Sequence, residues 1–163
     1  MTICGIMEMI KNNMKKIKYN EGDWFEIKLK SGKYFLGRIA RTSKKPGEIL
    51  GYFFGPSKIS YTNKNLKGFN ASNTRAIYIH GHLNIINGKW KLIKNNDNWK
   101  RNEWPISVFV RHEDFTERYW RVEYTDDIYS PSSETRISKK EAEGLQDNSL
   151  YGVDAVEVVL EKI

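Results

Sequence analysis

The sequence predicts a mainly β to α+β fold: a strongly curled antiparallel sheet or small barrel that opens with a three-stranded meander and carries one or two short helices. Hydrophobic and polar residues alternate in several short segments, which is typical of half-buried strands. Turn-forming residues separate these segments. The 163 residues include 7 Phe, 9 Tyr and 5 Trp, although the mean hydropathy is only −0.64. Because disordered chains lack such aromatics, we expect a packed core.

Length and composition indicate one domain. We assign residues 18–163 to a single β-rich domain that follows a flexible N-terminal extension, residues 1–17. No run of 18 apolar residues is present, which argues against a membrane span. The single cysteine, Cys4, cannot form an internal disulfide, and the N-terminus lacks the features of a secretory signal. We therefore expect a soluble protein in the reducing cytoplasm.

Three strands joined by tight turns are expected at the start of the domain. Phe25, Ile27 and Leu29 alternate with charged residues, which predicts a strand with one buried face. Residues 30–33 then form a turn in which Gly32 can adopt a positive φ. Further strands are expected at 33–41 and 49–54, with a second turn at 44–47.

The middle of the chain combines polar loops with short strands. Residues 57–73 are expected to form a loop or a short weak helix, and residues 94–102 a second polar loop. Asn87 and Gly88 form a hairpin turn signal between two short apolar segments. Strands are accordingly expected at 75–80, 83–86 and 89–93.

The last third of the chain contains further alternation and one helix signal. Ser138 and Glu141 form a capping box, which predicts a short helix that ends before Gly144. Alternating patterns predict strands at 106–110, 119–124 and 153–163. In the last of these strands, Glu157 and Glu161 are expected on the exposed side.

No catalytic or metal-binding constellation is recognisable. His80 and His82 would share one face of a straight strand, but zinc requires three or four ligands and the remaining histidine, His112, is distant in sequence. No nucleophile elbow is present. We therefore expect no catalytic residue, no metal and no cofactor. An enzyme that uses His80 and His82 is the least favoured alternative.

Charge is divided unequally along the chain. Residues 1–101 carry 20 basic and 6 acidic side chains, a net charge of +14, whereas residues 102–163 carry 7 basic and 14 acidic ones, a net charge of −7. This division predicts either a basic binding surface or two halves that complement each other within one fold. Lysines and aromatic residues interleave in the basic part, which also fits a β-barrel module that binds nucleic acid.

Two neighbouring segments carry a resemblance to a known family. Residues 21–29 contain a Gly-Asp-x-Phe start and an apolar strand, and residues 32–39 contain a glycine turn and a Gly-Arg pair. They resemble the opening of the immunity protein 26 family of bacterial polymorphic toxin systems. Residues 88–93 and 151–157 resemble the family's tryptophan-bearing segment and its glycine-plus-acid ending, so the similarity extends over about residues 18–163. The residues that carry it are Gly22, Asp23, Phe25, Gly32, Gly37, Arg38, Trp90, Gly152 and Glu157.

The resemblance implies a non-enzymatic antidote, which binds a toxin effector domain made by the same or a neighbouring cell and blocks it. The shared positions look structural. The glycines are expected to meet backbone requirements, and Trp24, Phe25 and Trp90 to lie in the core. Nucleic-acid binding remains the alternative function.

Recognition of the toxin is expected in the two polar loops, because loops on a rigid scaffold often carry binding residues. Trp and Arg are also enriched among the residues that dominate interface energies. The candidate partner-binding residues are Lys64, Lys67, Trp99, Lys100, Arg101 and Trp104. For the tryptophans, core packing is the alternative.

Overall fold

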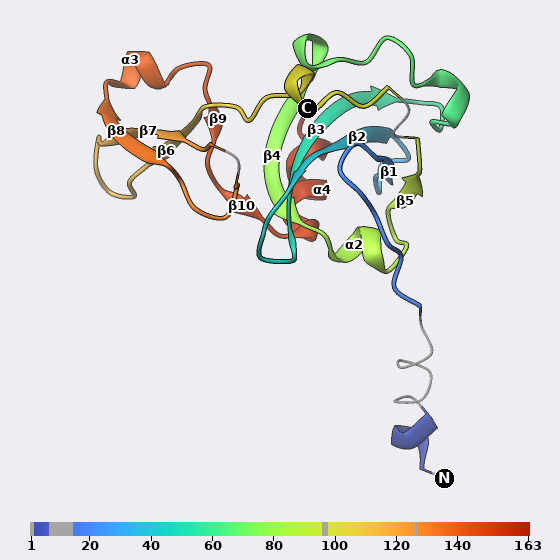
Figure 1. The fold of residues 1–163 in the computed structure, drawn as a ribbon. Coiled ribbons are helices and arrows are strands. Elements are labelled where there is room, and N and C mark those ends of the chain that lie inside the picture. Colours follow the sequence, from blue (N-terminus) through green and yellow to red (C-terminus); the bar gives the residue numbers. More distant parts are fainter. Residues whose placement is uncertain (1, 7–14, 96–97, 126) are drawn as a thin grey trace.

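The computed structural model describes residues 2–6, 15–95, 98–125 and 127–163. Figure 1 shows two sheets side by side. The larger has the strand order β10-β4-β3-β2-β1-β5 and the smaller the order β8-β7-β6-β9. The strands are β1 (Trp24–Lys28), β2 (Tyr34–Thr42), β3 (Glu48–Ser57), β4 (Ala76–Gly81), β5 (Lys91–Ile93), β6 (Phe109–His112), β7 (Tyr119–Glu123), β8 (Ser133–Ile137), β9 (Gln146–Asp147) and β10 (Leu150–Tyr151).

The fold class is mainly β, as expected, and it opens with the predicted antiparallel meander β1-β2-β3. Two open sheets, however, replace the single curled sheet or barrel. The physical reason lies in the C-terminal part of the chain, because β9 pairs in parallel with β6 while β10 pairs in parallel with β4. This short segment therefore adds an edge to each sheet instead of closing one barrel.

The segment expected to form a hairpin at Asn87-Gly88 contains a helical turn instead. Residues Leu83–Ile86 form α2, and the Asn87 N–H donates to the Leu83 carbonyl at 3.1 Å. Gly88 has a φ of +80°, so the Asn-Gly pair ends a helix rather than joining two strands. Ile85 is fully buried by this arrangement. Strand β5 consequently pairs with β1.

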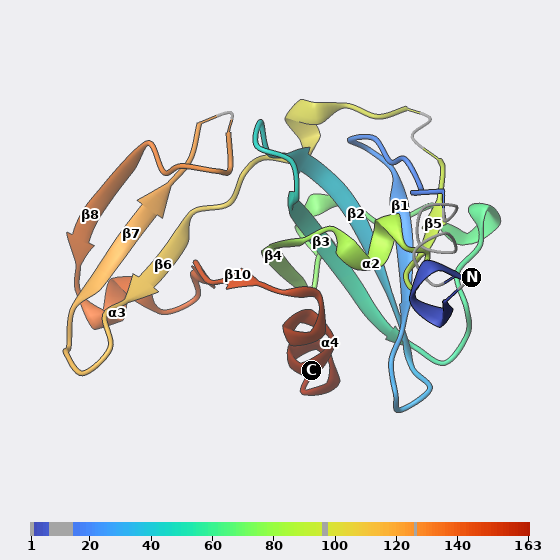
Figure 2. The same cartoon turned by 90° about the horizontal axis from the view of Figure 1, so that it is seen from below.

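The expected C-terminal strand is also wrong, because residues Val153–Glu161 form the helix α4. Its β-branched residues favour a strand, but Val156 and Leu160 lie four residues apart and are 0% and 1% exposed. Helical spacing places both on one face, and they pack with the large sheet. Figure 2 shows α4 against one side of that sheet.

The short helix α3 (Lys139–Ala142) is confirmed. The Ser138 side chain accepts a hydrogen bond from the Glu141 N–H at 3.1 Å, and the Glu141 carboxylate accepts one from the Ser138 N–H at 2.7 Å. Gly144 has a φ of +82°, as a residue just after a helix commonly does. Strand β8 is an element that the sequence did not indicate, because its first four residues are all exposed and lack apolar alternation.

The large sheet is buried on both faces. One face packs Phe25, Ile27 and Phe53 against α4 and Trp90. The opposite face packs Trp24 into a second core, which includes residues of β6 and β7 from the small sheet. The expectation that β1 has one solvent-exposed face is therefore wrong. Glu26, which was expected on that face, is only 6% exposed.

Mid-strand Gly37 illustrates how tightly the α4-side core is packed. It pairs with Phe25 across the β1–β2 ladder. A Cβ atom at position 37 would lie 2.2 Å from the Phe25 ring, so the ring lies directly on the glycine backbone. This is the close approach that a glycine within a strand commonly marks.

Candidate binding site

The structure brings the two polar loops together. Segments from residues 57–73 and 94–102 flank a surface hollow of about 340 Å³, with Arg38 of β2 among its lining residues. We call it the Arg38 hollow. The residues that line it are Trp24, Arg38, Asn63, Leu66, Lys67, Gly68, Phe69, Asn95 and Asn98.

Arg38 is enclosed by tryptophans. Its guanidinium carbon lies 4.4 Å from the ring centre of Trp24 and 4.7 Å from those of Trp99 and Trp104. Its Nε donates a hydrogen bond to the Gly22 carbonyl at 3.2 Å, and the residue is 7% exposed. Cation–π attraction strengthens when the cation is desolvated. The guanidinium is therefore held in one orientation.

Strand pairing and loop packing create this enclosure. Trp24 and Arg38 are direct cross-strand partners in β1 and β2, so their side chains lie on the same face. Trp104 meets Trp24 edge to face at 5.8 Å. Trp99 lies over Gly22, where an added Cβ would approach its ring to 2.7 Å and where φ is +94°. A side chain at position 22 would therefore clash with the Trp99 ring.

Two buried charged side chains hold the loops in place. The Glu26 carboxylate accepts hydrogen bonds from the Ser60 hydroxyl, at 2.8 and 3.0 Å, and from the Tyr61 N–H. Arg41 donates to the carbonyls of Trp104 at 2.9 Å and Arg101 at 3.4 Å. Both loops are thus tied to the strands that carry Trp24 and Arg38.

Burial governs the electrostatics around Arg38. Desolvation lowers the pKa of Arg38 to about 10, and the negative charges of Glu103 and Asp23 oppose that shift. Desolvation also raises the pKa of Asp23, while its hydrogen bond from the Asn20 N–H and the charges of Lys94 and Arg38 oppose the rise. Arg38 is still a cation at neutral pH, and it lies in a medium of low polarity, where charge interactions are strong.

The structure places the candidate partner-binding residues around this hollow in different ways. Lys67 lines it. Lys64 lies in the 3₁₀ helix η1 (Asn63–Asn65), next to the lining residue Asn63, and is exposed. Trp99 is half-buried on Arg38. Trp104 is 3% exposed and belongs to the core, so the packing alternative describes it.

The remaining two candidates form ion pairs on the surface. Lys100 pairs with Glu103 at 3.8 Å, and Arg101 pairs with Glu21 at 2.7 Å. Both belong to the second polar loop, whose end forms the 3₁₀ helix η3 (Arg101–Glu103). Exposed pairs of this kind contribute little to stability.

Comparison with known proteins identifies the family. The family model of immunity protein 26 matches residues 20–121, more than half of the chain. The chain belongs to the immunity protein 26 family. No curated protein and no solved structure matches it. The matched range includes the Arg38 hollow and both polar loops but ends within β7, so the resemblance noted at residues 151–157 lies outside it.

The motif residues of this immunity protein take the following positions. Trp24, Phe25 and Trp90, which we expected in the core, are 4%, 0% and 1% exposed. Gly32 adopts a φ of +85° in the β1–β2 turn. The backbone requirement expected at Gly152 is not found, because its φ is −64° and a Cβ there would meet nothing within 4 Å.

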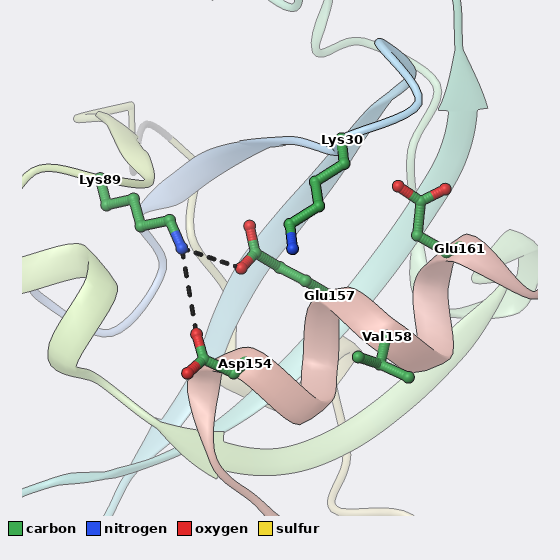
Figure 3. Close-up of a pocket in the computed structure, with 6 residues that line it drawn as sticks. All are labelled: Lys30, Lys89, Asp154, Glu157, Val158 and Glu161. Atoms are coloured by element: carbon green, nitrogen blue, oxygen red, sulfur yellow. Dashed lines mark hydrogen bonds and ion pairs between the residues drawn. The ribbon is translucent and has the colours of Figure 1, made fainter.

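A second hollow lies where α4 meets the β1–β2 turn. Figure 3 shows Lys89 bridging Asp154 at 3.9 Å and Glu157 at 3.1 Å. Glu161, one turn further along α4, accepts a hydrogen bond from the Ser31 N–H at 3.1 Å. The acids of the C-terminal part thus meet basic residues of the first part here, as complementary halves would. These contacts attach α4 to the β1–β2 turn and to the segment that precedes β5.

The histidines do not form a site. His80 is fully buried, and His82 precedes α2, where its Nδ1 lies 2.7 Å from the Tyr19 hydroxyl. Within the described ranges, no group of three or more His, Cys, Asp or Glu side chains is arranged to hold a metal ion. In the same part of the chain, no helix has both the length and the apolar character needed to cross a membrane.

Sequence reasoning missed the importance of Glu26, Arg38 and Arg41. Alternation predicted Glu26 on an exposed face, and nothing in the local sequence signals the loop that covers it. Arg38 was assigned a structural role only. The register that places Arg38 opposite Trp24 came only from the structure, because the turn expected at residues 30–33 would have paired Arg38 with Phe25 instead.

Proposed function

We propose that this immunity protein neutralises a cognate bacterial toxin domain in the cytoplasm by stoichiometric, reversible binding and without catalysis. The observation that carries the proposal is membership of the immunity protein 26 family over residues 20–121. That range contains a preorganised hollow with a buried cation in it. A binding group that is already held in one orientation, as Arg38 is, needs little ordering on association and so favours tight binding.

The Arg38 hollow is the part of the surface that we assign to the toxin. Glu26 ties Ser60 and Tyr61 to the sheet, and Arg41 ties the backbone of Arg101 and Trp104 to it. Lys64 and Lys67 are exposed at or beside the hollow. A basic face of this kind attracts an acidic partner surface, and such attraction speeds association at low salt. We therefore expect association rates that fall as ionic strength rises.

Nucleic-acid binding is less favoured by the geometry. Sequence-tolerant nucleic-acid binders use free aromatic faces on which bases stack. Here the rings of Trp24, Trp99 and Trp104 pack on Arg38. Lys100 and Arg101 are also paired with acidic side chains, which would compete with phosphates.

The test is to mix the purified protein with the toxin domain encoded beside it and to measure the complex by calorimetry and size-exclusion chromatography. We expect a one-to-one complex and survival of cells that express both proteins. The matched control is a toxin domain from an unrelated system. Absence of a complex at micromolar concentration, together with absence of protection, would refute the proposal.

A further inference from the structure

Arg38 has hydrogen-bonding capacity that the protein does not use. A guanidinium carries five N–H donors, and within the described part of the chain Arg38 makes one hydrogen bond, from Nε to the Gly22 carbonyl. The two terminal nitrogens of Arg38 form no hydrogen bond or ion pair with any described residue. They are not fully buried either, because the fully buried polar atoms without a partner do not include them. They therefore face the hollow, which Arg38 lines.

We infer that the Arg38 hollow receives the carboxylate of an aspartate or glutamate side chain of the toxin, which pairs with the terminal nitrogens of Arg38. The inference rests on the proposed function and specifies its chemistry. A planar guanidinium recognises a carboxylate through two parallel N–H···O bonds. The three tryptophans fix the plane of this guanidinium before any partner arrives.

The surroundings of the hollow supply further groups that suit a carboxylate. Lys67 adds a second positive charge, and its side chain forms no ion pair with a described residue. The lining residues Asn63, Asn95 and Asn98 carry amide groups that can donate hydrogen bonds. The toxin carboxylate would thus exchange its hydrogen bonds to water for bonds from several donors of the hollow. In surroundings of low polarity, such charge-assisted hydrogen bonds are strong.

The charges nearby favour one carboxylate over a phosphate backbone. The charges around the hollow are mixed, because Glu103 and Asp23 act electrostatically on Arg38 while Lys64 and Lys67 are exposed at or beside it. Binding of a nucleic-acid strand depends on many cations along its path. A single enclosed arginine suits a single anionic side chain instead.

The decisive variant is Arg38→Met, because methionine keeps an unbranched apolar chain between the tryptophans while removing the charge and the donors. Removing one partner of a buried, hydrogen-bonded charge pair commonly weakens binding by about 100-fold. We expect that loss in the Kd for the toxin domain encoded beside this protein. The Kd of Arg38→Lys should lie between those of the wild-type protein and Arg38→Met, because lysine keeps the charge but not the planar arrangement of donors.

A matched control is Arg136→Met in the small sheet. Arg136 is an exposed arginine of β8, at the far edge of that sheet, and its replacement should leave the Kd unchanged. A variant at the hollow that does not endanger the core is Lys67→Glu, since Lys67 is exposed. We expect it to slow association, whereas Lys162→Glu at the end of α4 should not.

The toxin side of the pair is found by replacing each of its exposed Asp and Glu residues by Asn or Gln. One such change should weaken binding to the wild-type protein and have almost no effect on binding to Arg38→Met, which is the signature of direct coupling. If Arg38→Met does not fold, as judged by its far-UV circular dichroism, Arg38→Lys takes its place in the same coupling measurement.

The outcomes separate the two proposals. If the wild-type protein does not bind the toxin domain, the proposed function and this inference both fail. If it binds, and folded Arg38→Met binds equally well or no toxin carboxylate couples to Arg38, only this inference fails. A labelled single-stranded oligonucleotide serves as a second probe. If the oligonucleotide binds the wild-type protein but not Arg38→Met, the hollow binds phosphate, and the inference of a toxin carboxylate is overturned.

Discussion

The buried imidazole of His80 makes stability depend on pH in a defined direction. Its Nδ1 lies 2.7 Å from the Gly81 carbonyl, which places the proton of the neutral ring on Nδ1. Its Nε2 is buried without a partner among the described residues, and the rings of Phe25, Phe53 and Trp90 surround it. Protonation would create a buried N–H at Nε2 with no acceptor.

This environment lowers the pKa of His80 from 6.5 to about 4, mainly through desolvation. Between these values the unfolded chain binds a proton that the folded protein does not. The free energy of unfolding is therefore highest above about pH 6.5 and falls as the pH drops toward 4. From about pH 7.5 to pH 5 the contribution of His80 should decrease by about 2 kcal/mol, at about 1.4 kcal/mol per pH unit once the unfolded chain titrates.

The assay is urea-induced unfolding of the wild-type protein and of His80→Leu, followed by tryptophan fluorescence at several pH values. Leucine is similar in volume and has no titrating group, so it removes the pH-dependent contribution of His80 alone. We expect the stability difference between the two proteins to shift by about 2 kcal/mol in favour of His80→Leu on going from about pH 7.5 to pH 5. A difference that stays constant over this range would refute the assignment of a buried neutral imidazole.

Three further predictions concern packing and loop anchoring. Leu160→Ala should lower the free energy of unfolding by about 2–5 kcal/mol because it leaves a cavity under α4. Val158→Ala, at a position that is 54% exposed, should change it by less than about 0.5 kcal/mol. Equal effects of the two substitutions would contradict the helical assignment. Gly22→Ala should destabilise the protein more than Gly68→Ala, since both glycines have a φ of +94° but only Gly22 lies against a ring, and thermal unfolding compares them directly. Glu26→Ala should cost about 2 kcal/mol and speed amide exchange in residues 57–73, with Glu26→Gln intermediate; unchanged exchange would show that this carboxylate does not hold the loop.

Parts of the fold follow from local sequence. The meander was predictable because Gly32 and the turn at residues 44–47 separate three short apolar segments, the first of them with a period of two, and such turns and patterns act over a few residues. The capping box of Ser138 and Glu141 was predictable for the same reason, since its hydrogen bonds close within one helical turn.

Other parts depend on contacts that are remote in sequence. Residues 153–163 contain β-branched side chains that suit a strand, and they become a helix because the sheet face accepts Val156 and Leu160 together. Glu26 has the charge of a surface residue, and it is buried because Ser60 and Tyr61, more than thirty residues away, hydrogen-bond to it.

The sequence by itself determined the fold class, the meander and the similarity to the immunity protein 26 family, because these depend on short-range patterns. Only the tertiary structure decided that the two polar loops flank one hollow and that Arg38, a motif residue, lines it and is enclosed by three tryptophans. The physical reason is that these tryptophans come from residues 24, 99 and 104. Their convergence is fixed by strand register and by the hydrogen bonds that buried Arg41 donates to the carbonyls of Trp104 and Arg101, which no local pattern contains.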